Sequence, residues 1–370
     1  MIPTEPFLCG TIETELEPDI LDTGVLYILP YIRSVNSIIH HQFDVSENLN
    51  FMPIPIYSQL PDISVMPDTP LIQEKLLSRI SEKMQRLDSL HLLPAGAIKR
   101  LHEEMRLLHT YHSGAIEGNT LTLSETKLVL EEGVTIGGKT LVEHIEATNN
   151  ARAFDLVEAI AGKRRAIDHV AVQQIHEVVT AGILEDAGRY RTHNVRITGA
   201  IKTPPDWSKV VGLMDGLIRE VSDSRMQPIG TAAFLHHRFV EIHPFTDGNG
   251  RVARLLANLY LIANGYPPVV IRTEDRGKYY KCLRSADAGD LVPFASFVAK
   301  SVDESLTLYL SIFGGVDELV PLKELVKWVP YSQEYLSLLA RRSALDAVKI
   351  GRVWYSSRRA VERYVGRLRG

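Results

Sequence analysis

Cysteine, long apolar runs and a strong net charge are what this chain has least of. Two cysteines, Cys9 and Cys282, occur among 370 residues. They are too few for a disulfide framework, and they fit a reducing compartment such as the cytoplasm. No apolar run reaches the roughly 18 residues of a membrane span, and no Lys or Arg precedes Arg33. We therefore expect no membrane contact and no basic start of a signal peptide. A net charge of −4 gives no global sign of nucleic-acid binding.

The charge is unevenly distributed along the chain. Residues 317–370 hold 11 Lys/Arg against 6 Asp/Glu, whereas the remaining residues hold 30 against 39. A basic tail on an acidic body indicates a domain boundary. We divide the chain into an N-terminal extension (1–69), rich in proline and with no readable role, a helical body (70–312) and a C-terminal unit (317–370).

Apolar residues recur every three or four positions through most of the body, which predicts a mainly α fold. Thr122 with Glu125 is a capping-box start, and Cys282 falls in a periodic stretch typical of a core thiol. The segment Tyr190–Pro205 is different, because apolar residues alternate there around Gly199 and predict a β-hairpin. Helical patterns cover 72–87, 98–108, 141–161, 168–183, 207–221, 229–242, 250–264, 276–288 and 293–312.

One stretch that begins at His243 concentrates the chemistry of the chain. It reads His-Pro-Phe-Thr-Asp-Gly-Asn-Gly-Arg-Val-Ala-Arg. His243 can take a proton near neutral pH, and Asp247 is a hard oxygen ligand suited to Mg²⁺. The turn Gly248–Gly250 precedes an apolar helix, so its main-chain N–H groups can face an anion at the positive helix end. Arg251 and Arg254 share one helix face, where both can hold phosphate oxygens. The stretch predicts a site for a nucleoside triphosphate.

The same string resembles the signature of the Fic family, HPF-x-[DE]-G-N-[GK]-R-x-x-R, at every fixed position. Similarity extends over roughly residues 70–305. It is especially close to the animal endoplasmic-reticulum AMP-transferases from His243 to Phe294, where Gly265-Tyr266-Pro267-Pro268 and Lys278-Tyr279-Tyr280 recur. The resemblance implies a mainly α Fic fold, a helical bundle with a small β-hairpin flap. It also implies transfer of AMP from ATP to a protein Ser, Thr or Tyr hydroxyl.

The resemblance also implies residue roles. His243 would act as the base, and Asp247 would hold the Mg²⁺ that bridges the phosphates. Asn249 and the main chain around it would hold the α-phosphate, while the flap would dock the target protein over His243 by strand pairing. The implied nucleotide-binding residues are Arg196, Ile197, Thr198, Gly199, Asp247, Gly248, Asn249, Gly250, Arg251, Val252, Ala253, Arg254, Tyr279, Tyr280 and Asp287.

Recognition of the base is the least determined part of this set. Tyr279 and Tyr280 are expected either to stack on or fence the adenine, or to pack as core aromatics. Seven residues after Tyr280, close relatives carry an Asn that reads the base, whereas this chain has Asp287. An ionised Asp accepts from the adenine amine but donates nothing, so strict selection of adenine stays open.

A second motif lies earlier in the chain. Ser113 and Glu117 are i and i+4 and share a helix face, and Gly118-Asn119 is a helix stop. The fragment matches the Fic inhibitory motif [ST]-x-x-x-E-[GN]. The resemblance implies that Glu117 pairs with Arg254 and occupies a fork meant for phosphate. We expect an intramolecular brake, although in relatives the same glutamate also orients a water that removes AMP.

Two other chemistries have to be weighed against this interpretation. Gly133–Thr140 fits the phosphate-loop pattern G-x-x-x-x-G-K-[ST], which belongs to a different class of nucleotide enzyme. A true phosphate loop follows a buried strand, whereas residues 123–132 have a helical pattern. A zinc site from His236, His237 and His243 lacks a Cys or Glu at ligand spacing.

The C-terminal unit resembles a winged helix-turn-helix of the excisionase/MerR type. DNA contact would come from its second helix and from Lys349 and Arg352 in the wing, and a protein-docking module is the equal alternative. A DNA-binding regulator whose Fic body only senses nucleotide is therefore the non-enzyme hypothesis, and a homodimer stays open. The expected elements are helices Leu322–Val329 and Ser332–Arg342, a hairpin Ala347–Tyr355 and a closing helix Ser357–Leu368.

Overall fold

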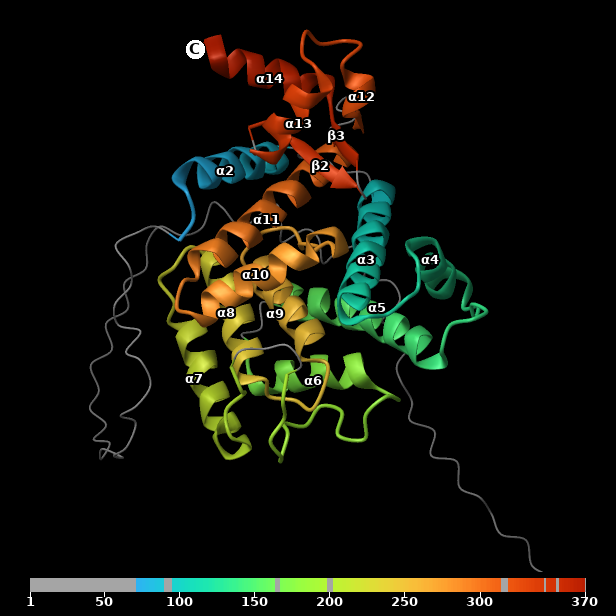
Figure 1. Cartoon of the computed structure of the whole chain (residues 1–370), viewed down its shortest axis with the longest axis vertical. Coiled ribbons are helices and arrows are strands. Elements are labelled where there is room, and N and C mark those ends of the chain that lie inside the picture. Colours follow the sequence, from blue (N-terminus) through green and yellow to red (C-terminus); the bar gives the residue numbers. More distant parts are fainter. Residues whose placement is uncertain are drawn as a thin grey trace, which may run out of the picture.

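A helical body with a small unit stacked on one end makes up the described part of the protein (Figure 1). The N-terminal extension predicted at 1–69 lies outside the described residues. Within them, no helix is both long and apolar enough to cross a membrane. The computed structural model describes residues 71–89, 95–163, 167–197, 202–313, 319–342, 344–350 and 353–369.

Most helices of the body lie within a few residues of the ranges that the apolar periodicity predicts, whereas the helix Ala95–Glu117 continues nine residues beyond the pattern predicted to end at residue 108. Short 3₁₀ turns, η3 (Trp207–Lys209) and η4 (Thr273–Asp275), lead into two of them. The α-helices are α2 (Glu74–Asp88), α3 (Ala95–Glu117), α4 (Leu123–Glu132), α5 (Leu141–Gly162), α6 (His169–Thr180), α7 (Val210–Ser222), α8 (Pro228–Ile242), α9 (Asn249–Ala263), α10 (Arg276–Asp287) and α11 (Val292–Phe313).

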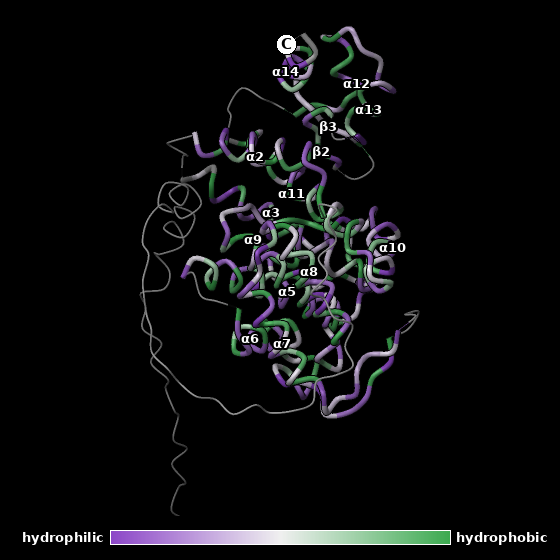
Figure 2. The backbone as a smooth tube through the Cα atoms, turned by 90° about the vertical axis from the view of Figure 1, so that its left-hand side faces the viewer, coloured by the Kyte–Doolittle hydropathy of each residue, from purple (hydrophilic) through white to green (hydrophobic). Residues whose placement is uncertain are grey.

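Helix α9 is the centre of the body, and its side chains reach two hydrophobic cores. Val252 and Leu255 lie in the core shared with α5 to α8. Ala257 and Leu261 lie in the core shared with α2, α10 and α11. Figure 2 shows the apolar segments gathered in the middle of the body. A helix buried on nearly all sides gives its N-terminus a fixed position, and this N-terminus carries the predicted site.

The phosphate-loop pattern belongs to an ordinary connection between two helices. Thr122 closes the predicted capping box at the start of α4, Gly133 ends that helix in the left-handed conformation, and Thr140 caps α5. The Lys139 ammonium donates to the carbonyl of Thr120 at 2.6 Å. Since a helix precedes the loop and its lysine is already bound, the alternative of a phosphate-loop enzyme is wrong.

The predicted β-hairpin is not seen in its described flanks. Residues 190–197 and 202–205 form no strand, and the tip, 198–201, lies outside the described residues. The physical reason is that the carbonyl oxygens of His193 and Pro205 accept hydrogen bonds from the Arg191 side chain, not from an opposite strand. The two described arms of the flap, 190–197 and 202–205, are therefore held together by the Arg191 side chain.

The C-terminal unit contains the predicted helices and hairpin, with one added strand. Its sheet has the order β1-β3-β2, both pairs antiparallel. The first helix is shorter than predicted and ends at Leu325, after which the chain continues as a turn. Assignment to the winged-helix class stays a prediction. The elements are β1 (Val320–Pro321), α12 (Leu322–Leu325), α13 (Gln333–Arg341), β2 (Ala347–Ile350), β3 (Val353–Ser356) and α14 (Arg358–Arg369).

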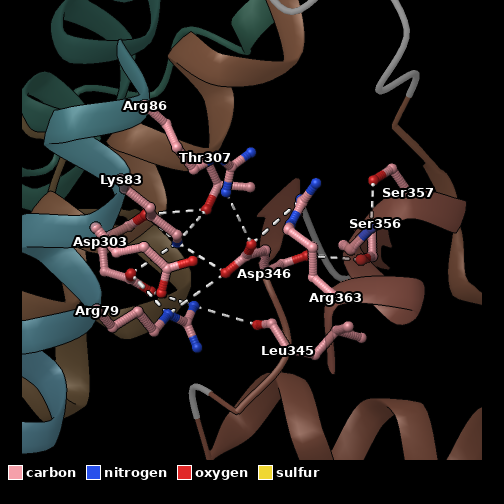
Figure 3. Close-up of polar contacts among 12 residues, drawn as sticks. Arg79, Lys83, Arg86, Asp303, Thr307, Leu345, Asp346, Ser356, Ser357 and Arg363 are labelled. Carbon is pink, nitrogen blue, oxygen red and sulfur yellow. Dashed lines mark hydrogen bonds and ion pairs between the residues drawn. The ribbon is translucent and has the colours of Figure 1, made fainter. Parts of the chain in front are cut away.

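A buried cluster of charges joins this unit to the body (Figure 3). Asp303 of α11 accepts from Arg79 Nε at 2.9 Å and from Lys83 Nζ at 2.7 Å, both from α2. Asp346, just before β2, lies 3.5 Å from Lys83 Nζ and 3.3 Å from Arg363 NH2. Although burial alone would raise it, these cations hold the pKa of Asp346 well below its usual range. Such a network is costly to break from one side, so we expect the unit to stay docked.

Candidate functional site

His243 lies at the end of α8, and one of its ring nitrogens is engaged by the main chain. It is the non-glycine residue with positive φ, 51°, in the described part of the chain. Its Nδ1 lies 3.2 Å from the Val240 carbonyl oxygen, which can only accept, so Nδ1 carries the proton. Nε2 is then the free basic nitrogen. Burial, with a smaller contribution from Arg191, lowers the pKa of His243, so the ring is neutral at pH 7.

The turn after His243 leads into α9 through tight main-chain contacts. Gly248 has a φ of 76°, and a Cβ there would meet Thr180 at 3.0 Å. The Asn249 amide accepts from the Phe245 N–H at 3.0 Å and donates to the Phe245 carbonyl at 2.9 Å. The predicted α-phosphate ligand therefore uses its side chain to close the loop, and the N–H groups of the helix start are positioned for an anion.

Glu117 is the last residue of α3. Its carboxylate lies against the first turns of α9, next to Gly250 and Arg254, and the inhibitory motif predicts the contact with Arg254. Glu117 Oε1 accepts from Arg254 NH2 at 2.7 Å. Arg254 also donates to Ser113, to Oγ at 2.9 Å and to the carbonyl at 3.0 Å. A Cβ at Gly250 would collide with the Glu117 carboxylate. Two residues of α3, Ser113 and Glu117, thus accept hydrogen bonds from the Arg254 guanidinium. The Arg254 side chain is only 3% exposed.

Arg251 has a second carboxylate partner, which the sequence did not predict. Its NH1 donates to Glu146 of α5 at 2.9 Å, and its NH2 lies 3.5 Å from Asp247 Oδ2. Glu146 also accepts from the Asn119 amide at 3.0 Å. Both motif arginines are thus paired with carboxylates. The pair around Arg251 connects the catalytic turn to the residues just after Glu117.

Several predicted nucleotide-binding residues have other surroundings. The side chains of Val252 and Ala253 are fully buried in the core, so only their main chain can serve a ligand. Tyr279 is also a core residue, 1% exposed, and its hydroxyl lies 3.0 Å from His236 Nε2. This burial favours the alternative of Tyr279 as a core aromatic over a ring that stacks on the adenine.

The remaining predicted residues lie at the surface or outside the described part. Arg196 is exposed and Ile197 is half-buried, whereas Thr198 and Gly199 lie outside the described residues. Tyr280 is half-buried, and the Arg276 guanidinium lies 4.9 Å from its ring centre. Asp287 accepts from His237 Nε2 at 3.0 Å.

Asp247 is the residue whose chemistry suits a divalent cation. Its side chain is 67% exposed. In the part of the chain that the structure describes, no group of three His, Cys, Asp or Glu side chains could hold a metal by itself. Mg²⁺ is commonly held by one or two carboxylates and completes its shell with water and phosphate oxygens, so a single exposed carboxylate beside an anion site fits it.

Two residues besides Glu146 contact the catalytic turn, although the sequence did not single them out. His176 of α6 stacks on Phe245 with ring centres 3.6 Å apart, and its Nε2 lies 3.1 Å from the Asp247 carbonyl oxygen. Arg191 binds the main chain of the catalytic turn. No pattern marks these residues in a single sequence, because each acts through a contact with a distant segment. A buried His on an apolar helix face looks the same whether or not it supports a site.

The site can hold a triphosphate at a helix start, place a neutral imidazole beside it, and block one guanidinium with a carboxylate. Residues 166–261 match the profile of the Fic/DOC family, the stretch that includes His243, Asp247 and both arginines. The chain belongs to the Fic/DOC family. The Fic identity predicted from the motif is therefore confirmed.

Curated relatives of this Fic protein carry the name protein adenylyltransferase Fic. One from Nematostella vectensis is 38% identical over 252 residues, which are 66% of this chain and 58% of the relative. One from Culex quinquefasciatus is 36% identical over 254 residues, 68% of this chain and 51% of the relative. The chain thus spans just over half the length of these relatives.

Solved structures agree with this assignment of the fold. A Fic-domain signalling protein from Bacteroides thetaiotaomicron superposes with a TM-score of 0.61 at 28% identity, covering 64% of this chain and 98% of that one. Fic-1 from C. elegans gives a TM-score of 0.59 at 33% identity, covering 65% of this chain and 73% of that one. The predicted mainly α Fic fold is therefore confirmed for the body.

Proposed function

We propose that this Fic protein is an autoinhibited, Mg²⁺-dependent enzyme that transfers AMP from ATP to a hydroxyl of a target protein. The observation that carries the proposal is the Glu117–Arg254 contact beside His243. The proposal is supported by three neighbouring features: Nδ1 of His243 faces a carbonyl oxygen, α9 begins six residues later, and Arg254 of that helix donates to Glu117. The names of the relatives support the same activity.

The chemistry follows from the free nitrogen of His243. A Ser, Thr or Tyr hydroxyl oxygen attacks the α-phosphorus of ATP, and its proton passes to His243 Nε2. A P–O bond forms to the target, the bond between the α-phosphorus and the bridging oxygen breaks, and pyrophosphate leaves. A positioned general base of this kind typically contributes about 10²–10⁴-fold. Since the lowered pKa of His243 keeps the ring neutral, the base is ready at physiological pH.

The surrounding residues neutralise and orient the phosphates. The start of α9 would hold phosphate oxygens by main-chain N–H groups, and Asp247 would hold Mg²⁺, which neutralises charge on the phosphates when bound. Arg254 would bind the end of the triphosphate once Glu117 leaves. While Glu117 stays, the γ-phosphate cannot take the same donors, and the α-phosphate is misaligned with His243.

Removal of AMP from a modified protein is a second candidate for the same site. Arg254 donates a hydrogen bond to Oε1 of Glu117. The Glu117 side chain is 34% exposed, so its other oxygen, Oε2, is available for a water. A carboxylate oxygen at that place could orient a water toward the α-phosphorus.

Binding of DNA through the C-terminal unit stays a prediction. Of the two wing residues expected to contact DNA, Lys349 is half-buried and Arg352 lies outside the described residues.

The position of the label in ATP tests the proposal directly. The Glu117→Gly protein is incubated with MgCl₂, a cell lysate as acceptor pool, and ATP labelled at either the α- or the γ-phosphate. Above the level of lysate alone, we expect label on protein from the α-phosphate only, and none from the double variant that carries His243→Ala as well as Glu117→Gly. Label from the γ-phosphate would indicate a kinase, and label that persists without His243 would exclude the proposed base. Release of AMP from pre-labelled protein by the wild type alone would favour the second candidate.

A further inference from the structure

Arg191 is a buried cation whose partners are all main-chain carbonyl groups. Its side chain is 3% exposed. Within the part of the chain that the structure describes, its hydrogen bonds go to His243, His193 and Pro205. Burial lowers the pKa of Arg191, and the charge of the Asp206 carboxylate opposes this shift, but no carboxylate among the described residues accepts a hydrogen bond from the guanidinium. A buried guanidinium held by main-chain carbonyl groups in place of a hydrogen-bonded carboxylate is unusual. It therefore calls for an explanation other than a salt bridge.

The three carbonyl groups belong to three separate segments. Nε donates to the His243 carbonyl oxygen at 2.8 Å. NH1 donates to His193 at 2.9 Å and NH2 donates to Pro205 at 2.6 Å, which are the two arms of the flap. The Arg191 main-chain N–H donates to the Pro244 carbonyl at 2.9 Å. One residue thus ties both arms of the flap to the catalytic turn.

We propose that Arg191 is a positioning residue that sets the distance between the flap and His243, and so between the docked target hydroxyl and its base. The inference rests on the proposed AMP transfer. A planar guanidinium presents its donors in a fixed fork, and here three separate nitrogens each hold one carbonyl oxygen, whereas lysine carries all its donors on a single nitrogen. His243 has a left-handed backbone, and a strained residue of this kind persists only when its surroundings hold it.

We call the hydrogen bonds from Arg191 to His243, His193 and Pro205 the clamp. The clamp should affect the transfer of AMP to a protein more than its transfer to water. A target segment must be aligned by the flap, whereas a water molecule reaches the α-phosphorus without it. A misplacement of about 1 Å can cost roughly 10²-fold in rate. In the Glu117→Gly background, Arg191→Met should lower AMP transfer to protein about 100-fold. It should lower hydrolysis of ATP to AMP and pyrophosphate by less than about tenfold.

The informative measurement is the ratio of protein-bound AMP to free AMP, because a general loss of folding would lower both products equally and leave this ratio unchanged. ATP labelled at the α-phosphate is supplied with a cell lysate, and protein-bound label and free AMP are counted in the same reaction. Arg189→Met is the matched control, because Arg189 is an exposed arginine of the same segment, and it should leave the ratio unchanged. Arg191→Lys should stay defective. An equal loss of both products, or recovery with lysine, would overturn the proposal.

Hydrogen–deuterium exchange separates this inference from the proposed function. Peptides covering 191–197, 202–206 and 243–248 should exchange faster in Arg191→Met than in Arg189→Met. Unchanged exchange would show that the clamp is absent. If the clamp is present but the Glu117→Gly parent transfers no AMP, the proposed function fails while the connection of flap and catalytic turn stands.

Discussion

Removal of the Glu117 carboxylate should raise AMP transfer by a factor that the geometry sets. The contact with Arg254 is one charge-assisted hydrogen bond of 2.7 Å, and the Glu117 side chain is 34% exposed. Hydrogen bonds to charged groups contribute about 1.5–3 kcal/mol net, and this exposure favours the lower part of that range. A brake held by about 1.5–2 kcal/mol corresponds to a rate increase of roughly 10–30-fold for Glu117→Gly, since 1.4 kcal/mol is tenfold.

A graded pair of variants tests whether charge is the cause. Glu117→Gln keeps the length of the side chain and a neutral acceptor, so it should lose about 1 kcal/mol and raise the rate roughly fivefold. Glu104→Gln is the control, because Glu104 is an exposed glutamate of the same helix α3. Initial rates of α-label incorporation at saturating ATP give the comparison. Equal rates for wild type and Glu117→Gly, or an equal rise with Glu104→Gln, would refute the reasoning.

The remaining expectations concern the base, the loop and the domain junction. Because its pKa is lowered, His243 loses its proton below the ordinary histidine value of about 6.5. The kcat/KM of Glu117→Gly should therefore rise with pH and reach half its maximum below about pH 6.5, and a midpoint above about pH 7 would contradict this. Lys139→Ala in the same background should keep transfer within about twofold, since its ammonium binds Thr120; loss of transfer would revive a phosphate-binding role. Asp346→Ala should lower the free energy of unfolding by about 3–5 kcal/mol in urea titrations, because Lys83 would lose a buried partner, and a change below about 1 kcal/mol would contradict a fixed junction.

The sequence could predict the helices and the catalytic turn because their signals are local. Capping residues such as Thr122 stand beside the helix that they start, and the residues from His243 to Arg254 lie on one turn and one helix. The resemblance also implied Val252 and Ala253 as nucleotide-binding residues, and their burial leaves only their main chain for a ligand.

Contacts between distant segments were beyond single-sequence reasoning. Glu146 is one of several acidic residues of α5, and only the fold brings it to Arg251. The flap was predicted as a hairpin from its alternating apolar residues, but the main-chain groups at its base bond to the Arg191 side chain. In each case the deciding partner lies far away in sequence or in a side chain with no local pattern.

A crystal structure of the Glu117→Gly protein with a non-hydrolysable ATP analogue and Mg²⁺ tests most directly whether Arg254 is shared between brake and nucleotide. We expect a γ-phosphate oxygen within hydrogen-bond distance of Arg254 NH2, at the place of Glu117 Oε1, with the α-phosphate at the start of α9 facing His243 Nε2. A triphosphate bound elsewhere, with Arg254 still directed only at Ser113, would contradict it.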